Sequence, residues 1–234
     1  MAATPANIER PIRLIADILK AIFKFFNMHL VFSTSLENRK KFFARTGVNP
    51  EKAVKMELIH GNRVVAVSPK DSGKRIRECD GLVTNSPGLP LALPVADCLP
   101  IAFFDPVTKS IGLAHAGWRG LQKEIIKNTV LLLQKDFGVE PTYLEVLIGA
   151  HICPMHYEVK DDVLGKLKNY SEAINKKDGK EFLDLGKVAQ MQLLNLGVKK
   201  ENIETDGRCT FENEIFFSYR RNHTSGRNLY ILSM

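Results

Sequence analysis

The chain has 234 residues, of which 44% are hydrophobic, 25% charged and 8% aromatic, with four cysteines and a net charge of +7. This length fits one large domain, and the ordinary composition excludes disordered, fibrous and disulfide-scaffold proteins. The basic residues form scattered doublets rather than a basic helix, so the positive charge predicts no nucleic-acid partner. The cysteines are widely spaced, which is typical of reduced thiols, and we expect a cytoplasmic protein.

The first 29 residues differ in pattern from the rest of the chain. Apolar residues from Ile12 to Phe26 recur at helical spacing, flanked by arginines and lysines, which predicts an amphipathic helix. Charges interrupt the apolar run and no small-residue cleavage site follows it, so we expect neither a signal peptide nor a membrane span. We interpret residues 1–29 as an N-terminal helical extension that packs on protein, without membrane association.

Residues 30–234 alternate short apolar runs with helical patterns. In chain order, apolar and β-branched runs predict strands at residues 30–34, 64–67, 91–95, 100–104, 110–115, 144–148, 216–219 and 228–232. Apolar periodicity predicts helices at residues 38–45, 121–137, 163–167 and 187–196, and glycines end the second and fourth of them. The order of these elements predicts a single α+β domain with mixed β-sheets flanked by helices.

Three residues that can bind a metal, His60, Cys98 and His115, each lie near the end of a strand-like segment and next to a turn. Zinc favours imidazole nitrogen and thiolate sulfur, and three protein ligands leave one tetrahedral position open, as in catalytic sites. Taken singly, Cys98 also fits a buried core thiol and His115 a core histidine. The spacing alone leaves these alternatives open.

The hexapeptide from His115 to Gly120 adds a second chemical group beside this candidate metal site. Its glycines let backbone amides approach an anion closely, and the start of the following helix favours negative charge. Arg119 adds a planar, permanently charged donor suited to phosphate or carboxylate. This pattern predicts an anion site next to a metal ligand; an ordinary glycine turn with a surface arginine is the alternative.

Four motifs together resemble the laccase-domain family: His60-Gly61, residues 80–84 (DGLVT), residues 96–100 (ADCLP) and residues 115–120 (HAGWRG). This family was first labelled multicopper polyphenol oxidase and is now regarded as zinc-dependent purine nucleoside phosphorylases. The resemblance runs from about Val31 to the C-terminus through shorter motifs at residues 148–149, 157–159, 209–210, 217–221 and 226–227. We therefore interpret residues 30–234 as a laccase-like purine nucleoside phosphorylase domain.

The resemblance implies that His60, Cys98 and His115 bind Zn²⁺. It also implies phosphorolysis of adenosine, inosine and 5′-methylthioadenosine to free base and ribose 1-phosphate, together with adenosine deaminase activity. A purine nucleoside and phosphate are thus the expected partners, while the sequence predicts no oligomeric state.

The remaining roles at the expected site are less specific. Asp80 and Asp97 are the nearest carboxylates that could protonate the leaving base, and Asp97 could instead orient a ligand histidine. Arg119 is the expected phosphate-binding residue. Arg220 is the next candidate, ahead of Arg221 and Arg227.

The chain departs from the family pattern at several positions. The segment after the first strand, residues 33–38, lacks the usual glycine-rich insertion, Leu58 replaces an expected glutamine, and Gly149-Ala150 replaces Gly-Pro. The shortened segment is expected near the substrate pocket. Substrate preference therefore stays open.

Other functions compete with nucleoside phosphorolysis. A cysteine hydrolase or deamidase would use Cys98 as nucleophile and His115 as base, and some bacterial relatives imply a role in editing peptidoglycan precursors. Copper-dependent phenol oxidation needs more histidine ligands than a chain with six histidines offers. A non-enzymatic binding module is the last alternative.

Overall fold

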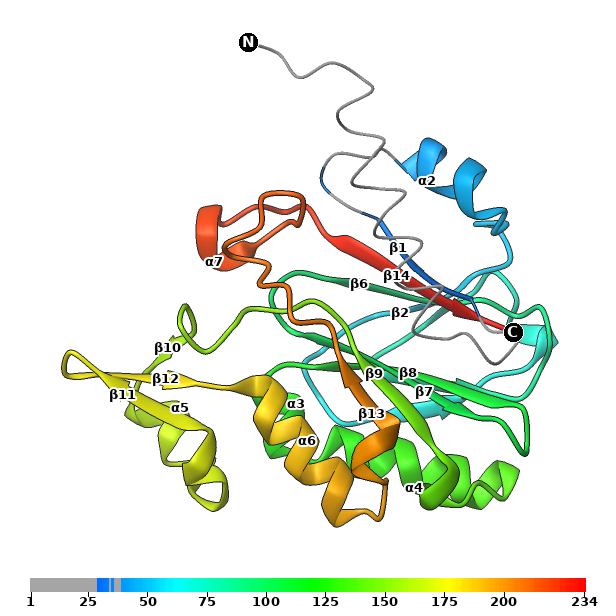
Figure 1. The fold of residues 1–234 in the computed structure, drawn as a ribbon. Helices are drawn as coiled ribbons and strands as arrows, with labels where there is room; N and C mark the ends of the chain where they lie inside the picture. The colour runs from blue at the N-terminus through cyan, green and yellow to red at the C-terminus, as the bar shows by residue number, and fades with distance from the viewer. Residues whose placement is uncertain (1–28, 34, 36–38) are drawn as a thin grey trace, which may run out of the picture.

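The computed structural model describes residues 29–33, 35 and 39–234, and the predicted N-terminal helix lies outside them. Two large β-sheets stack face to face, with helices on the outer side of each (Figure 1). A small third sheet extends from one end of this stack. The α+β class with mixed sheets is confirmed.

The first sheet has five strands in the order β1 (His29–Phe32), β14 (Asn228–Ser233), β6 (Leu91–Val95), β2 (Val54–Met56) and β4 (Arg75–Ile76). The second has six in the order β13 (Ile203–Thr205), β9 (Glu145–Ile148), β7 (Leu99–Asp105), β8 (Ser110–Ala116), β5 (Gly81–Thr84) and β3 (Val64–Ala66). The third has the order β10 (Glu158–Val159), β12 (Lys180–Leu183) and β11 (Ile174–Lys177). The central pairs β14–β6, β9–β7, β7–β8 and β8–β5 are antiparallel, while β6–β2, β2–β4, β13–β9 and β5–β3 are parallel.

The helices are α2 (Arg39–Thr46), α3 (Trp118–Gln122), α4 (Ile125–Phe137), α5 (Asp161–Leu164), α6 (Leu185–Asn195) and α7 (Tyr219–Asn222). Short 3-10 turns lie at Pro69–Asp71, Pro141–Tyr143, Lys168–Ala173 and Lys200–Asn202. Helices α4 and α6 cover the outer face of the six-stranded sheet, whereas α2 lies against the five-stranded one (Figure 1). Within the described residues, no helix is long and apolar enough to cross a membrane.

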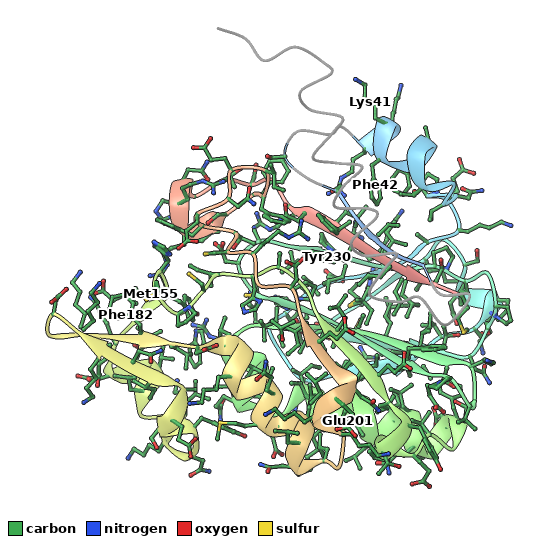
Figure 2. The ribbon with its side chains drawn as sticks, in the orientation of Figure 1. Lys41, Phe42, Met155, Phe182, Glu201 and Tyr230 are labelled. Carbon is green, nitrogen blue, oxygen red and sulfur yellow. The ribbon has the colours of Figure 1, made fainter. Side chains whose placement is uncertain are left out.

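Strand β7 shows why the central strands are unbroken apolar runs in the sequence. Successive side chains of a strand point to opposite faces. Ala102 and Phe104 pack between the two large sheets, and Ile101 and Phe103 pack against the helices. All seven residues of β7 are buried, so both faces of the strand must be apolar. Tyr230 of β14 fills the space between the sheets, where Figure 2 labels it.

Two predicted elements differ from the structure. The helix predicted over residues 121–137 is two helices, because the chain turns at Glu124, whose φ of 62° is left-handed. The strand predicted at residues 216–219 is absent: Phe216 is fully buried in a loop, and the Ser218 side chain accepts a hydrogen bond from the Arg221 amide to begin α7. Two-residue strands such as β4 and β10 are too short to show a period in the sequence.

Candidate active site

The three predicted metal ligands lie together at one end of the β7–β8 pair. In that pair Leu99 is opposite Ala116, so Cys98, directly before β7, lies beside the end of β8 that carries His115. His60 comes from the loop between β2 and β3. The ligand atoms of all three lie within 4.8 Å of one another. His115 is buried, Cys98 half-buried and His60 exposed, so the group is open to solvent on one side.

Asp80 holds both histidine segments in place. One of its carboxylate oxygens lies 2.8 Å from Nδ1 of His115 and accepts a hydrogen bond of 3.0 Å from the His60 amide. The other accepts hydrogen bonds from the amides of Ile59 and Gly61, at 3.2 and 2.8 Å. The Asp80 side chain is fully buried. One carboxylate therefore orients the His115 ring and fixes the loop that carries His60.

The charges in this group favour a thiolate beside an imidazolium when no metal is bound. Burial raises the pKa of Cys98, but hydrogen bonds from His115 and His60 lower it to about 6. Burial lowers the pKa of His115, but its contacts with Asp80 and Cys98 raise it to about 9. Burial would raise the pKa of Asp80, yet the hydrogen bonds from His115 and Gly61 hold it below its ordinary value. At neutral pH all three groups are therefore charged.

This donor set fits a zinc ion. Zinc bonds of about 2.0–2.3 Å in a tetrahedron place ligand atoms about 3.3–3.8 Å apart, and the three ligand atoms here lie within 4.8 Å of one another, close to that spacing. A carboxylate on the far nitrogen of a ligand histidine, as Asp80 is on His115, is the usual partner of such a ligand. Three ligands leave the fourth position free for a substrate atom.

The glycines of the 115–120 hexapeptide have a packing reason that the sequence did not indicate. A Cβ on Gly117 would lie 2.8 Å from Sγ of Cys98. A Cβ on Gly120 would lie 3.3 Å from the carbonyl oxygen of Gly61 and 3.4 Å from that of His115. Both glycines thus permit close approach of the segments that carry the ligands. Helix α3, which follows Gly117, has only five residues and contributes little helix dipole.

Arg119, the expected phosphate-binding residue, is exposed and lies over the ring of Trp118, with its guanidinium carbon 4.3 Å from the ring centroid. Nζ of Lys166 lies 5.3 Å from the centroid of the same ring. Lys166 follows α5 and adds a second cation that no motif indicated. The positive charge at this position therefore comes from the side chains of Arg119 and Lys166 more than from the amides of the short helix α3.

Asp97 and Arg220 link the Cys98 turn to a distant loop. The Asp97 carboxylate accepts 2.7 Å hydrogen bonds from the Thr210 hydroxyl and from the backbone amide of Arg220. The carboxylate that contacts His115 is that of Asp80, whereas Asp97 organises the loop after β13. The motifs did not distinguish the two roles, because Asp97 adjoins Cys98 in the sequence, whereas Asp80 is far from all three candidate ligands along the chain and meets His115 only in the fold.

Tyr157 is a site residue that sequence reasoning missed, although it belongs to a motif of the resemblance. Burial and nearby Cys98 raise the pKa of Tyr157, while the positive charges of Arg220 and Arg119 oppose the rise. The Arg220 guanidinium lies 5.0 Å from the centre of the Tyr157 ring and donates to the carbonyl of Glu158. Tyr157 and both arginines therefore share one region with Cys98.

The other two candidate arginines bind backbone. The Arg221 guanidinium donates to the carbonyls of Thr210, Phe211 and Phe216, at 2.6 to 2.9 Å. That of Arg227 donates to the carbonyls of Thr224 and Gly226. Both stabilise the loops on either side of α7.

The protein combines an α+β fold of two stacked sheets with a group of two histidines and one cysteine held by a buried carboxylate. This combination is that of a protein with a candidate metal centre. The chain matches the family described as multi-copper polyphenol oxidoreductase laccase over residues 32–234, and it belongs to that family.

Several curated relatives carry the name purine nucleoside phosphorylase. The one from Corynebacterium glutamicum is 37% identical over 196 residues, covering 81% of this chain and 77% of the relative. YfiH from Escherichia coli is 35% identical over 196 residues, covering 82% and 77%. The crystal structure of YlmD from Geobacillus stearothermophilus is similar with a TM-score of 0.79 and 34% identity, over 83% of this chain and 78% of that one.

Proposed function

We propose that this protein is a zinc-dependent purine nucleoside phosphorylase of the cytoplasm. The observation that carries the proposal is the convergence of His60, Cys98 and His115 around an open position, with Asp80 holding both histidine segments. Similarity to several curated relatives named purine nucleoside phosphorylase supports the substrate class.

In this proposal His60, Cys98 and His115 bind the zinc ion. When bound, zinc supplies a Lewis acid that polarises a substrate oxygen. Asp80 is fully buried, with its pKa lowered, so it stays ionised and acts as a positioning residue instead of a proton donor. Asp97 has both oxygens occupied by hydrogen bonds and holds the neighbouring loop.

The cations near Tyr157 bind the phosphate that attacks C1′ of the ribose while the bond to the base breaks. Arg119 provides a planar pair of donors from an exposed position, and the Arg220 guanidinium lies 5.0 Å from the centre of the Tyr157 ring. The positive charges of both arginines act on the Tyr157 hydroxyl. Tyr157 keeps its proton at neutral pH because its pKa is raised, so it donates a hydrogen bond to the substrate. Adenosine, inosine and 5′-methylthioadenosine are the proposed substrates, with adenosine deamination as a second activity.

The test combines metal analysis with a product assay. We expect zinc in the purified protein and phosphate-dependent release of base from a panel of nucleosides. His60→Asn should lose the metal of this site and the activity. His223→Asn is the matched control, because His223 is also exposed with a left-handed backbone (φ 50° against 56° for His60), which asparagine tolerates. Nucleoside turnover that stays intact in His60→Asn, or that needs no phosphate, would refute the proposal.

A cysteine hydrolase is the second candidate, and the low pKa of Cys98 beside a protonated His115 favours it. Zinc bound to Cys98 removes the free thiolate. Protein that carries no metal there, and whose Cys98 reacts rapidly with iodoacetamide as purified, would favour the hydrolase. Copper in place of zinc would favour oxidative chemistry.

A further inference from the structure

Four further metal-binding side chains meet outside the site described above. Cys153 and His156 come from the loop between β9 and β10, and Cys209 and Glu212 come from the loop after β13. Their ligand atoms all lie within 4.8 Å of one another. We call this group the Cys153–Cys209 cluster. Met155, between the first two ligands, lies on the exposed loop before β10 (Figure 2).

We propose that the Cys153–Cys209 cluster is a second zinc site, closed by four protein ligands. Within it, Nδ1 of His156 lies 3.2 Å from Sγ of Cys153, 3.9 Å from Sγ of Cys209 and 3.3 Å from Oε1 of Glu212. Sγ of Cys153 lies 3.7 Å from the same Glu212 oxygen. A tetrahedral zinc ion with bonds of about 2.0–2.3 Å separates its ligand atoms by about 3.3–3.8 Å. These four separations of 3.2–3.9 Å lie within about 0.1 Å of the range that a zinc ion requires, and the other pairs lie within 4.8 Å.

The local backbone also has the form of a structural zinc site. Each loop supplies its ligands as a pair three residues apart around a tight turn, closed by hydrogen bonds from the amide of His156 to the carbonyl of Cys153 and from Asn213 to Cys209. Ligands separated by two residues are typical of structural zinc sites. The sequence did not indicate this site, because each pair of ligands contains only one cysteine and therefore forms no CxxC motif.

Groups around the cluster hold the ligands in position without a metal. The backbone amide of Cys153 donates a hydrogen bond of 3.2 Å to Sγ of Cys209, an arrangement that stabilises a thiolate. The ring of His156 stacks on Phe211, with centroids 4.4 Å apart and an interplanar angle of 17°. A disulfide between the two cysteines would leave the placement of His156 and Glu212 without a reason, whereas a metal uses all four.

A metal ion at the second site would cross-link the loop between β9 and β10 to the loop after β13, and both loops extend to the first metal site. Thr210, next to Cys209, donates to Asp97 beside Cys98, and Tyr157 follows His156 directly. A metal in the cluster would thus fix Tyr157 and Thr210 relative to the His60, Cys98 and His115 centre. This role is structural, since four ligands leave no position for a substrate.

The experiment measures zinc per chain in full-length protein purified and kept under reductant. We expect two zinc ions per chain in the wild type, one in Cys98→Ser, one in Cys209→Ser and none in the double variant. If the first site holds no zinc, the wild type carries one ion that Cys209→Ser loses and Cys98→Ser keeps. The second site is therefore tested independently of the proposed function.

Two further measurements cover variants that fold poorly. Glu212 is largely exposed, and Glu212→Gln replaces an anionic ligand with a neutral amide. The change should lower zinc affinity at the second site by about tenfold or more in chelator competition, because losing even a group that only orients a metal ligand costs about 10–100-fold. Glu214→Gln, an exposed residue of the same loop, is the matched control and should retain the wild-type affinity. In cobalt-substituted Cys98→Ser, the thiolate-to-cobalt charge-transfer band should remain, and Cys209→Ser should weaken it in that background. One zinc per chain, lost in Cys98→Ser and unaffected by Cys209→Ser, would overturn the proposal, as would a Cys153–Cys209 disulfide in the reduced preparation.

Discussion

Replacement of Asp80 by asparagine tests how the candidate active site is held together. The change keeps the size of the side chain and removes its charge. One carboxylate oxygen becomes an NH₂ group, which would face two hydrogen-bond donors instead of accepting from them. Which two are lost depends on the orientation of the amide: either Ile59 and Gly61, or His60 and His115.

The magnitude follows from these contacts. A hydrogen bond to a charged group contributes about 1.5–3 kcal/mol, so losing two of four predicts a loss of about 3–6 kcal/mol in the free energy of unfolding. The rise in the pKa of His115 from 6.5 to about 9 corresponds to roughly 3 kcal/mol, shared between Asp80 and Cys98. We therefore expect a loss near the lower end, about 3 kcal/mol, which leaves a protein of ordinary stability folded.

Two assays check this prediction. Urea denaturation of the metal-free protein should show the lost stability, and chelator competition should show zinc affinity at the first site reduced by about 10–100-fold. Asp105→Asn is the control: Asp105 is also buried and accepts hydrogen bonds from Val107 and Thr108, but it lies at the other end of β7. It should lose stability without losing zinc affinity. An Asp80→Asn protein that matches the wild type in both assays would refute the reasoning.

Three further predictions concern neighbouring residues. In metal-free protein, iodoacetamide should label Cys98 with a half-maximal rate near pH 6, because only the thiolate reacts and the pKa of Cys98 is lowered from 9.0 to about 6. Cys153, whose pKa burial and Cys209 raise to about 12, should stay unlabelled at that pH. A midpoint near pH 9 for Cys98 would show that the two histidines do not stabilise its thiolate. Gly117→Ala should weaken zinc binding and cost about 1–3 kcal/mol of stability, since its Cβ would lie 2.8 Å from Sγ of Cys98, whereas Gly207→Ala, with nothing within 4 Å, should change neither. Arg119→Lys should keep the zinc but raise the KM for phosphate about tenfold, because lysine cannot form the paired hydrogen bonds of a guanidinium. If the ratio of phosphorolysis to deamination is the same in the variant and the wild type, Arg119 does not bind phosphate.

The sequence by itself determined the class of fold and the identity of the candidate ligands. Long apolar runs such as residues 100–104 and 110–115 are strands in the structure, because both of their faces are buried and no polar residue interrupts them. His60, Cys98 and His115 are residue types that can bind a metal, and the motifs that contain them resemble those of a family in which such residues bind zinc. Gly138 likewise ends α4 in a left-handed conformation, as its position after the apolar periodicity predicts.

Only the tertiary structure decided which groups surround those ligands. Asp80 rather than Asp97 contacts His115, because the pairing of β5 with β8 brings residue 80 beside residue 115, and motif spacing carries no information on strand pairing. The loop at Phe216 depends on packing in the core between the sheets, which overrides the local apolar pattern, and the left-handed turn at Glu124 has no signal in the apolar periodicity. The cluster of Cys153 and Cys209 forms for the same physical reason: the loops that follow β9 and β13 lie side by side because those two strands are parallel neighbours.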